Sequence, residues 1–188
     1  MVVVDLTKAA RESKEAIAKI EAESGVKVAD CYQCGKCSAG CPAASAMDLQ
    51  PRQVIRNLQL GMYEETLKSH TIWLCAHCHT CVTRCPQDVD LPTLMEALRA
   101  EAKAKGYVAE KEIKRFDEIF TKYVRKYGKS HEMFLSAEYN ITTGHFTQDA
   151  MSAPHMYAKG MIRVSPHKVK NPAVIKQIMD KCQNGGAK

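Results

Sequence analysis

Apolar residues recur at intervals of three and four along most of the chain, and this spacing predicts α-helices. The segment 5–24 forms one such amphipathic stretch, and Gly25 can end that helix in a left-handed conformation. The residues on its apolar face are Leu6, Ala9, Ala10, Ser13, Ala16, Ile17 and Ile20. No alternating strand pattern of useful length lies between residues 41 and 75. We therefore expect an all-α fold.

Two shorter segments share one apolar pattern. Pro51 opens the first, which Gly61 ends; Leu91 and Pro92 open the second, which Gly106 follows. Proline is common in the first turn of a helix and glycine just beyond its end. The apolar positions three, four and seven residues after Pro51 and after Leu91 are Val54, Ile55, Leu58, Leu94, Met95 and Leu98. The shared offsets indicate an internal duplication.

The pattern changes beyond Gly106. Apolar residues at intervals of three and four predict a helix over 110–129. Because this segment has fewer than three full heptads, we expect the helix to pack on the protein's own core rather than to form an intermolecular coiled coil. Those residues are Ile113, Phe116, Phe120, Tyr123 and Tyr127, with Ile119 and Val124 beside them. We expect short helices and loops over 130–172, with loop markers at Gly144, Pro154, Gly160 and Pro166. A last helix is expected from Pro172, with Ile175, Ile178 and Met179 as its apolar positions and fraying at 184–186.

All but one of the nine cysteines fall into two copies of one spacing. The first motif, Cys31-x-x-Cys34-x-x-Cys37-x-x-x-Cys41-Pro42, recurs as the second motif, Cys75-x-x-Cys78-x-x-Cys81-x-x-x-Cys85-Pro86. Three such cysteines can bind three corners of a cubane [4Fe–4S] cluster, and in the bacterial-type spacing the fourth cysteine binds the other motif's cluster. We therefore expect two [4Fe–4S] clusters. The ligands are Cys31, Cys34, Cys37 and Cys85 for the first cluster, and Cys75, Cys78, Cys81 and Cys41 for the second.

Other uses of these cysteines fit the spacing less well. Structural zinc binds pairs of CxxC knuckles and needs neither the third cysteine nor the trailing Cys-Pro. Disulfides need an oxidising compartment, and we expect no secretory signal, because the short apolar run 2–4 is followed by Asp5 and Lys8. His77 and His79 invite a Rieske-type interpretation, but four cysteines already complete each cluster.

The residues between the cysteines are expected to tune the clusters. Backbone amides can donate to cluster sulfurs and raise the reduction potential. The amides in question are those of Gln33, Gly35, Lys36, Ser38, Ala76, His77, His79 and Thr80. Gly35 and Gly40 permit close backbone approach, and Trp73 is expected to shield a cluster from water rather than to conduct electrons. Cys182 has no partner spacing and is expected to be a packed or partly exposed thiol.

Composition narrows the range of functions. The formal charge of +6 counts the cysteines as neutral, and two oxidised clusters on eight thiolates bring it to about +2. Aromatic residues are not interleaved with a basic stripe, which disfavours nucleic-acid binding, and no apolar stretch reaches the ~20 residues of a membrane span. No GxGxxG segment and no P-loop is present, which disfavours a stand-alone reductase. A structural or DNA-associated cluster protein remains an alternative.

Several segments resemble the iron–sulfur C subunit of the coenzyme B–coenzyme M heterodisulfide reductases of methanogens. The resemblance is close over residues 30–99, and the tail is similar in its Met- and His-rich character. The segments that carry it are Cys31–Pro42, Gln50–Gln53, Thr71–Cys75 and Val89–Pro92. The same helical ferredoxin module occurs in the iron–sulfur subunits of succinate dehydrogenases and in glycolate oxidase-type proteins.

The resemblance implies a helical ferredoxin domain over 30–105, preceded by an N-terminal helix (1–29) and followed by a subunit-docking extension (106–188). It implies a cytoplasmic complex with a flavin-bearing A subunit and a catalytic B subunit, in methanogenesis with flavin-based electron bifurcation. The sequence has no Cys-Cys pair and no CCG segment. We therefore expect an electron carrier without a catalytic site, in a larger hetero-oligomer. An electron-transfer subunit of a succinate dehydrogenase-like or glycolate oxidase-like complex is the alternative.

Overall fold

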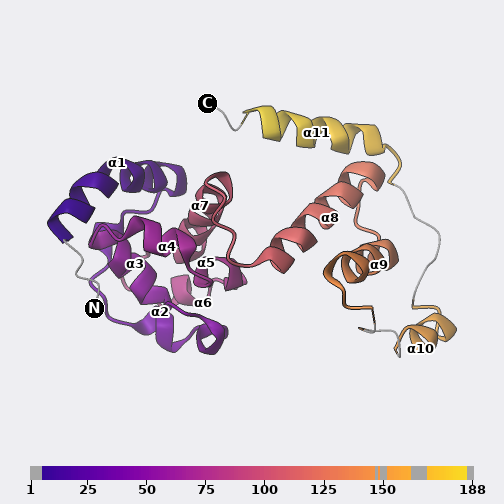
Figure 1. Cartoon of the computed structure of the whole chain (residues 1–188), viewed down its shortest axis with the longest axis horizontal. Coiled ribbons are helices and arrows are strands. Elements are labelled where there is room, and N and C mark those ends of the chain that lie inside the picture. The colour runs from indigo at the N-terminus through magenta and orange to yellow at the C-terminus, as the bar shows by residue number, and fades with distance from the viewer. Residues whose placement is uncertain (1–5, 147, 149–151, 162–168, 186–188) are drawn as a thin grey trace. The chain divides into compact units, whose positions relative to one another are not determined.

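The computed structural model describes residues 6–146, 148, 152–161 and 169–185, which form helices joined by turns and loops, with no strand among them (Figure 1). The expected all-α class is thereby confirmed. The chain divides into a first unit, residues 1–110, and a second unit, residues 111–188. The first unit contains α1 (Leu6–Ser24), η1 (Val28–Asp30), α2 (Lys36–Ala39), η2 (Ala44–Ala46), α3 (Pro51–Gln59), α4 (Tyr63–Lys68), α5 (Thr71–Leu74), α6 (Thr80–Thr83) and α7 (Leu91–Ala104), where η marks a 3₁₀ helix. The second contains α8 (Lys111–Tyr127), α9 (Glu132–Thr143), α10 (Ala153–Ala158) and α11 (Pro172–Gly185).

Helices α3 and α7 supply most of the core of the first unit. All six apolar positions shared by the two predicted helices are buried, as the duplication predicts. Helix α7 packs against α1, α4, α5 and α6, whereas α3 packs against α2, α4 and η1. Leu98 on α7 is fully buried, and replacing it with alanine would cost about 2–5 kcal/mol.

Helix α1 covers this core with one edge of its predicted face. Ile20 is fully buried, Ser13, Ala16 and Ile17 are half-buried, and Ala10 is exposed. The side chains of Leu6 and Ala9 lie outside the described residues. Gly25 ends the helix with φ +69° and donates its N–H to the carbonyl of Glu21, as the left-handed cap predicts.

A carboxylate fixes the start of α5, the short helix that leads into the second motif. The side chain of Asp48 accepts hydrogen bonds from the backbone N–H groups of His70 and Thr71 and from the Thr71 hydroxyl. Burial tends to raise the pKa of Asp48, but these bonds outweigh it and the pKa lies below its usual value. The loop after the first motif is thereby attached to the helix before the second.

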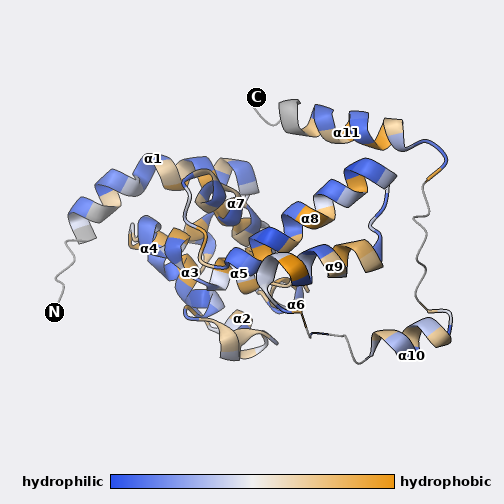
Figure 2. Cartoon of the chain, turned by 45° about the vertical axis from the view of Figure 1, so that its right-hand side comes forward, coloured by the Kyte–Doolittle hydropathy of each residue, from blue (hydrophilic) through white to orange (hydrophobic). Residues whose placement is uncertain are grey.

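In the second unit α8 packs against α9 and α11, so the prediction that this helix packs on its own core is confirmed. Ile119 and Tyr127 of α8 and Leu135 of α9 are buried, and the Phe116 ring meets Tyr139 edge to face. Blue and orange stretches alternate along α8 and α11 in Figure 2, as in helices that are apolar on one side only.

The segment 130–172 is more regular than its weak periodicity predicts. Helix α9 is a continuous element of 12 residues, and Pro154 lies in the first turn of α10 rather than in a loop. Proline is tolerated there because the first turn of a helix needs no backbone N–H donor. Gly144 does end α9 in a left-handed conformation, whereas Pro166 lies outside the described residues.

Candidate metal centre

The two cysteine loops, residues 31–37 and 75–81, have matching backbones. Gln33 and Gly35 in the first loop adopt left-handed conformations with φ +64° and +82°. His77 and His79 occupy the same places in the second loop, with φ +50° and +57°. Three non-glycine residues in this region are therefore strained, a feature that clusters at binding sites. The duplication predicted from the sequence thus extends to individual backbone torsions.

A short helix follows each loop at the same point. Helix α2 begins at Lys36 and α6 at Thr80, each directly after a left-handed residue, and the two helices pack together. A Cβ atom added to Gly40 would lie 2.4 Å from an Nη atom of Arg84, which the second motif contributes. The close approach expected at Gly40 is therefore to this side chain. The two motifs are interleaved in space and do not form separate lobes.

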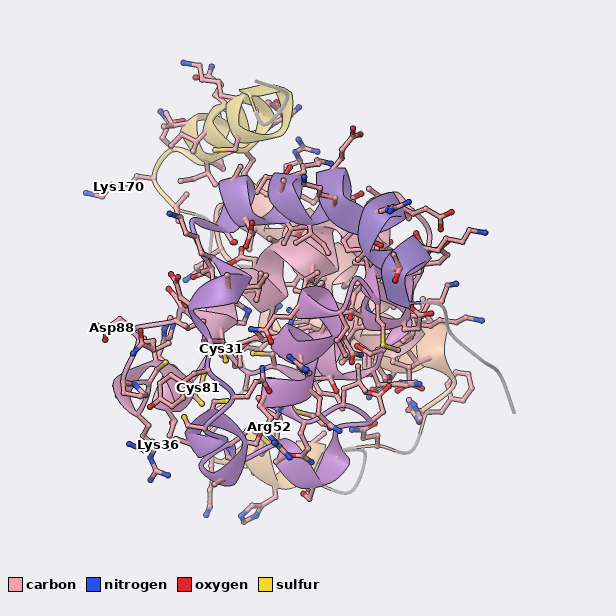
Figure 3. The ribbon with its side chains drawn as sticks, turned by 90° about the vertical axis from the view of Figure 1, so that its left-hand side faces the viewer. Cys31, Lys36, Arg52, Cys81, Asp88 and Lys170 are labelled. Atoms are coloured by element: carbon pink, nitrogen blue, oxygen red, sulfur yellow. The ribbon has the colours of Figure 1, made fainter. Side chains whose placement is uncertain are left out.

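One cavity gathers a cysteine of the first motif with three of the second. It is lined by Cys41, Cys75, Cys78 and Cys81, the four ligands expected for the second cluster. Its apolar walls come from the starts of α3 and α7 and from the segment after Cys41, with Pro51, Leu91, Pro92 and Met95 among them. In Figure 3, yellow sulfur atoms gather around the labelled Cys31 and Cys81 on one side of the first unit.

Cys85, from the second motif, is close to the first loop. Partial desolvation raises the pKa of Tyr32, and negative charge at Cys34, Cys85 and Cys31 raises it further. Tyr32 is thus within electrostatic reach of three of the four ligands expected for the first cluster. The backbone N–H of Val89 donates to Cys85 Sγ at 3.3 Å. The second-motif cysteine and the first loop are neighbours.

The pKa shifts of the cysteine thiols show that the site favours bound positive charge. Burial raises the pKa of Cys37, Cys75 and Cys81, the last to about 11, and neighbouring cysteine thiolates raise each of them further. A set of mutually repelling, half-buried thiolates is unfavourable without positive charge among them. Iron supplies that charge, so cluster binding would release protons. This donor set therefore fits an iron–sulfur cofactor.

Hydrogen-bond donors surround the sulfur atoms. A hydrogen bond from Thr80, through its hydroxyl and then its backbone N–H, lowers the pKa of Cys78. The N–H of His77 acts on Cys75 and that of Ser38 on Cys37, where each opposes the effect of burial. Of the amides expected to tune the clusters, those of Ser38, His77 and Thr80 thus already face cysteine sulfur.

Two residues that the sequence did not single out anchor the loops. Gln59, at the end of α3, donates from Nε2 to the carbonyls of Val28 (2.7 Å) and Cys31 (2.8 Å). Arg99 on α7 donates from Nε to the carbonyl of Ile72 (2.9 Å) and from Nη2 to that of Cys75 (3.1 Å). A third bond of Arg99 reaches the Trp73 carbonyl at 3.4 Å. A shared offset from the two helix starts is the signal that could have revealed them.

The remaining candidates differ in where they lie. Trp73 is buried in α5, His77 and His79 line the cavity of the second loop, and Cys182 is an exposed thiol of α11. All nine cysteines belong to the described residues, and none forms a disulfide. Within the described ranges no three His, Cys, Asp or Glu side chains could hold a single metal ion, and no helix is long and apolar enough to cross a membrane.

Comparison with known proteins matches this site to one family. Residues 27–89 match the 4Fe-4S dicluster domain, a span that includes both motifs. The chain is 40% identical over 90 residues to the iron–sulfur C subunit of the CoB–CoM heterodisulfide reductase of Methanopyrus kandleri. The aligned residues make up 48% of this chain and 47% of that protein. It is 34% identical over 96 residues to the C subunit of the H₂:CoB–CoM heterodisulfide, ferredoxin reductase of Methanothermobacter marburgensis, covering 51% and 52%.

A third relative, the second iron–sulfur C subunit of the CoB–CoM heterodisulfide reductase of Methanocaldococcus jannaschii, is 40% identical over 79 residues, which is 42% of each chain. The chain spans about half the length of the curated relatives it matches. The resemblance noted from the motifs is thereby confirmed for that half. Residues 27–89 match the 4Fe-4S dicluster domain, and the chain is similar over about half its length to the iron–sulfur C subunits of heterodisulfide reductases.

Proposed function

We propose that this chain is the electron-transfer subunit of a cytoplasmic heterodisulfide reductase complex of methanogenesis. It receives electrons from a flavin-bearing A subunit and passes them to a catalytic B subunit that reduces a disulfide. In such a complex the chain serves the branch of flavin-based bifurcation that ends at the disulfide. The observation that carries the proposal is the interleaved pair of cysteine loops within a segment matched to the 4Fe-4S dicluster family.

The ligand assignment is part of this proposal. Cys31, Cys34, Cys37 and Cys85 hold one cluster, and Cys75, Cys78, Cys81 and Cys41 hold the other. The cavity shared by Cys41 with the second loop and the position of Cys85 near Tyr32 both support crossed ligation. A bound [4Fe–4S] cluster supplies one-electron transfer near neutral pH. The chain's own residues hold it, direct N–H groups at its sulfurs and exclude water with the apolar starts of α3 and α7.

In this proposal the chain itself catalyses no disulfide reduction. A disulfide-reducing site needs a place for a two-sulfur substrate beside a redox group, and all the motif cysteines are already committed as cluster ligands. The one additional cysteine, Cys182, lies on α11 in the second unit. Disulfide chemistry therefore belongs to the catalytic subunit.

The second unit supports a docking role. In the described part of the chain every exposed large hydrophobic side chain except Tyr32 lies in this unit. They are Phe116, Phe120, Ile141, Phe146, Met156, Tyr157, Met161, Val174 and Ile178. Exposed large apolar side chains gather in this unit, which favours an interaction role, and aromatic and Met residues are enriched in interface cores. We assign this surface to contact with the catalytic subunit.

Isolation of the native complex tests the proposal. Anaerobic co-purification, with subunits identified by mass, is expected to yield a flavoprotein and a cysteine-rich disulfide reductase. Phe120→Glu and Ile178→Glu are expected to leave iron content unchanged and to abolish assembly, because both residues are exposed on different helices of the second unit. Thr142→Glu, an exposed polar position on α9, is the matched control and should assemble normally. Recovery with a succinate- or glycolate-oxidising flavoprotein would refute the assignment.

A further inference from the structure

Gln59 and Arg99 occupy equivalent places in the two halves of the duplication. Each lies eight residues after the start of its helix, Pro51 for α3 and Leu91 for α7. Each donates to the carbonyl of the first cysteine of its motif and to the carbonyl three residues earlier. The two side chains therefore perform the same structural task on matching backbone atoms.

The two anchors differ in charge. A glutamine amide is neutral, whereas an arginine guanidinium is protonated at every pH at which proteins fold. Arg99 is half-buried, and in the described part of the chain its hydrogen bonds go to backbone carbonyls. Its charge is thus held against the first cysteine of the second loop without a neutralising carboxylate bonded to it.

Other cations near the site do not cancel this difference. Arg52 passes near Gly35 in the first loop, Arg56 donates from Nη1 to Gln59 Oε1 at 3.3 Å, and Arg84 lies over Gly40. These three side chains are exposed, as is Lys36; Arg52 and Lys36 are labelled in Figure 3. Salt screens exposed charges much more strongly than a half-buried one. Arg99 is the cation that the fold fixes against a ligand.

We propose that Arg99 is a positioning residue that raises the reduction potential of the cluster bound by Cys75 above that of the cluster bound by Cys31. Reduction adds one negative charge to a cluster, and a fixed positive charge nearby stabilises the reduced form. Gln59 gives the first loop the same hydrogen bonds without this stabilisation. An electron shared by the two sites then resides mainly at the second loop.

The inference rests on the proposed function and gives it a direction. Electrons enter at the first loop, beside the exposed ring of Tyr32, and leave from the second loop. The donor protein accordingly faces the first loop, and the acceptor faces the second. One electron passes from the reduced first cluster to the oxidised second cluster, and no proton is transferred and no bond is formed or broken.

The test exchanges the two anchors in the full-length, cluster-loaded chain. Arg99→Gln retains an amide donor and removes the charge, Gln59→Arg adds a charge to the first half, and Arg99→Lys keeps the charge with a different donor geometry. Iron and sulfide are counted first, and the midpoint potentials of both clusters are then measured by a redox titration monitored by electron paramagnetic resonance. The titration is repeated at high salt.

Arg99→Gln should lower the higher of the two midpoints and leave the lower one nearly unchanged. We expect at least a tenfold change in the distribution of an electron between the clusters, which equals about 59 mV for a one-electron couple. Gln59→Arg should raise the lower midpoint, and Arg99→Lys should keep most of the wild-type separation. High salt should leave the effect of Arg99→Gln largely intact.

Full iron content with unshifted midpoints in Arg99→Gln, or a shift confined to the lower midpoint, would overturn the inference. If Arg99→Gln fails to retain iron, the midpoint potentials of Gln59→Arg provide the test. A raised lower midpoint supports tuning by charge, and unchanged midpoints refute tuning by charge. Failure of the proposed function looks different, because the wild-type chain would then lack iron and sulfide or would reduce the disulfide unaided.

Discussion

Cys41 and Cys75 belong to different motifs, yet they line one cavity together. Burial is the main cause that raises the pKa of Cys75, and negative charge at Cys41 raises it further. Cys41 follows the short helix α2, whereas Cys75 directly follows α5. This pairing is the geometric reason for expecting each motif to complete the other's cluster. Both cysteines must be present for the cluster of the second loop to be complete.

Replacing Cys41 with serine should therefore damage the cluster of the second loop. The cluster held by Cys31, Cys34 and Cys37 should be retained, since its fourth ligand is expected to be Cys85. Electron paramagnetic resonance of the reduced variant, compared with Cys85→Ser as the matched partner, distinguishes the two clusters. Loss of the sequence-local cluster in each variant would show uncrossed ligation.

Removal of the metal should unfold the interleaved loops. Helices α2 and α6 pack together, and the expected ligands come from both motifs, so the energy of cluster binding should be part of the folding energy. Hydrogen exchange after anaerobic chelation should show lost protection in much of the segment 30–99. Helices α8 and α9, which carry no ligands, serve as the internal control and should keep theirs. Unchanged protection of both loops would contradict this expectation.

The matched left-handed positions predict unequal effects of substitution. Gly35→Ala should lower the free energy of unfolding by about 1 kcal/mol, because φ at this position is +82° and the nearest side-chain atom, Arg52 Cδ, leaves room for a Cβ atom at 3.6 Å. His79→Gly should change it less, since relief of strain offsets the added freedom of the unfolded chain. Urea unfolding of the iron-loaded variants under anaerobic conditions measures both. Equal losses would argue against the torsional explanation.

A histidine makes the first unit sensitive to pH. His70 Nδ1 lies 2.6 Å from Glu110 Oε1, and this hydrogen bond raises the pKa of His70 above its usual 6.5. The folded state binds this proton more tightly, so the stabilisation is fully present below about pH 6.5 and is lost as the pH rises through the higher folded value. Both side chains are partly exposed, so the effect should be a few tenths of a kcal/mol.

Thermal unfolding of the wild type between pH 6 and 8 measures this dependence. Glu110→Gln is the control and should flatten the profile in that window, because the amide carries no charge to hold the proton. A wild-type stability that rises over the same interval would show that another group dominates.

The sequence predicted the parts of the fold that periodicity and cysteine spacing encode. The apolar offsets from Pro51 and Leu91 identified the core helices, because one stripe of each faces the interior. Helix α9 was expected in shorter pieces because Leu135 is its sole buried residue, which leaves no apolar stripe to read. Local pattern therefore reveals a helix whose apolar residues lie on one face and conceals one whose apolar residues are not confined to one face.

The candidate site likewise has a part that the sequence predicted and a part that only the fold revealed. Cysteine spacing named the ligands, but the roles of Gln59 and Arg99 depend on where distant carbonyls come to lie after folding. The left-handed torsions of His77 and His79 were equally hidden, because non-glycine residues seldom adopt such a conformation, even though histidine does so more often than most. The equal offsets of Gln59 and Arg99 from the two helix starts mark them as equivalent positions, but not as residues that bind backbone carbonyls.

Reduction of the isolated chain in the presence of its disulfide tests most directly whether it carries electrons without performing the reaction. A strong reductant should load one electron on each of two clusters, enough for one disulfide, which takes up two electrons and two protons to give two thiols. We predict that the mixed disulfide of coenzymes B and M remains intact until the catalytic subunit is added, and that thiols then form as the clusters reoxidise. Thiol formation by the isolated chain alone would contradict the assignment of a pure electron carrier.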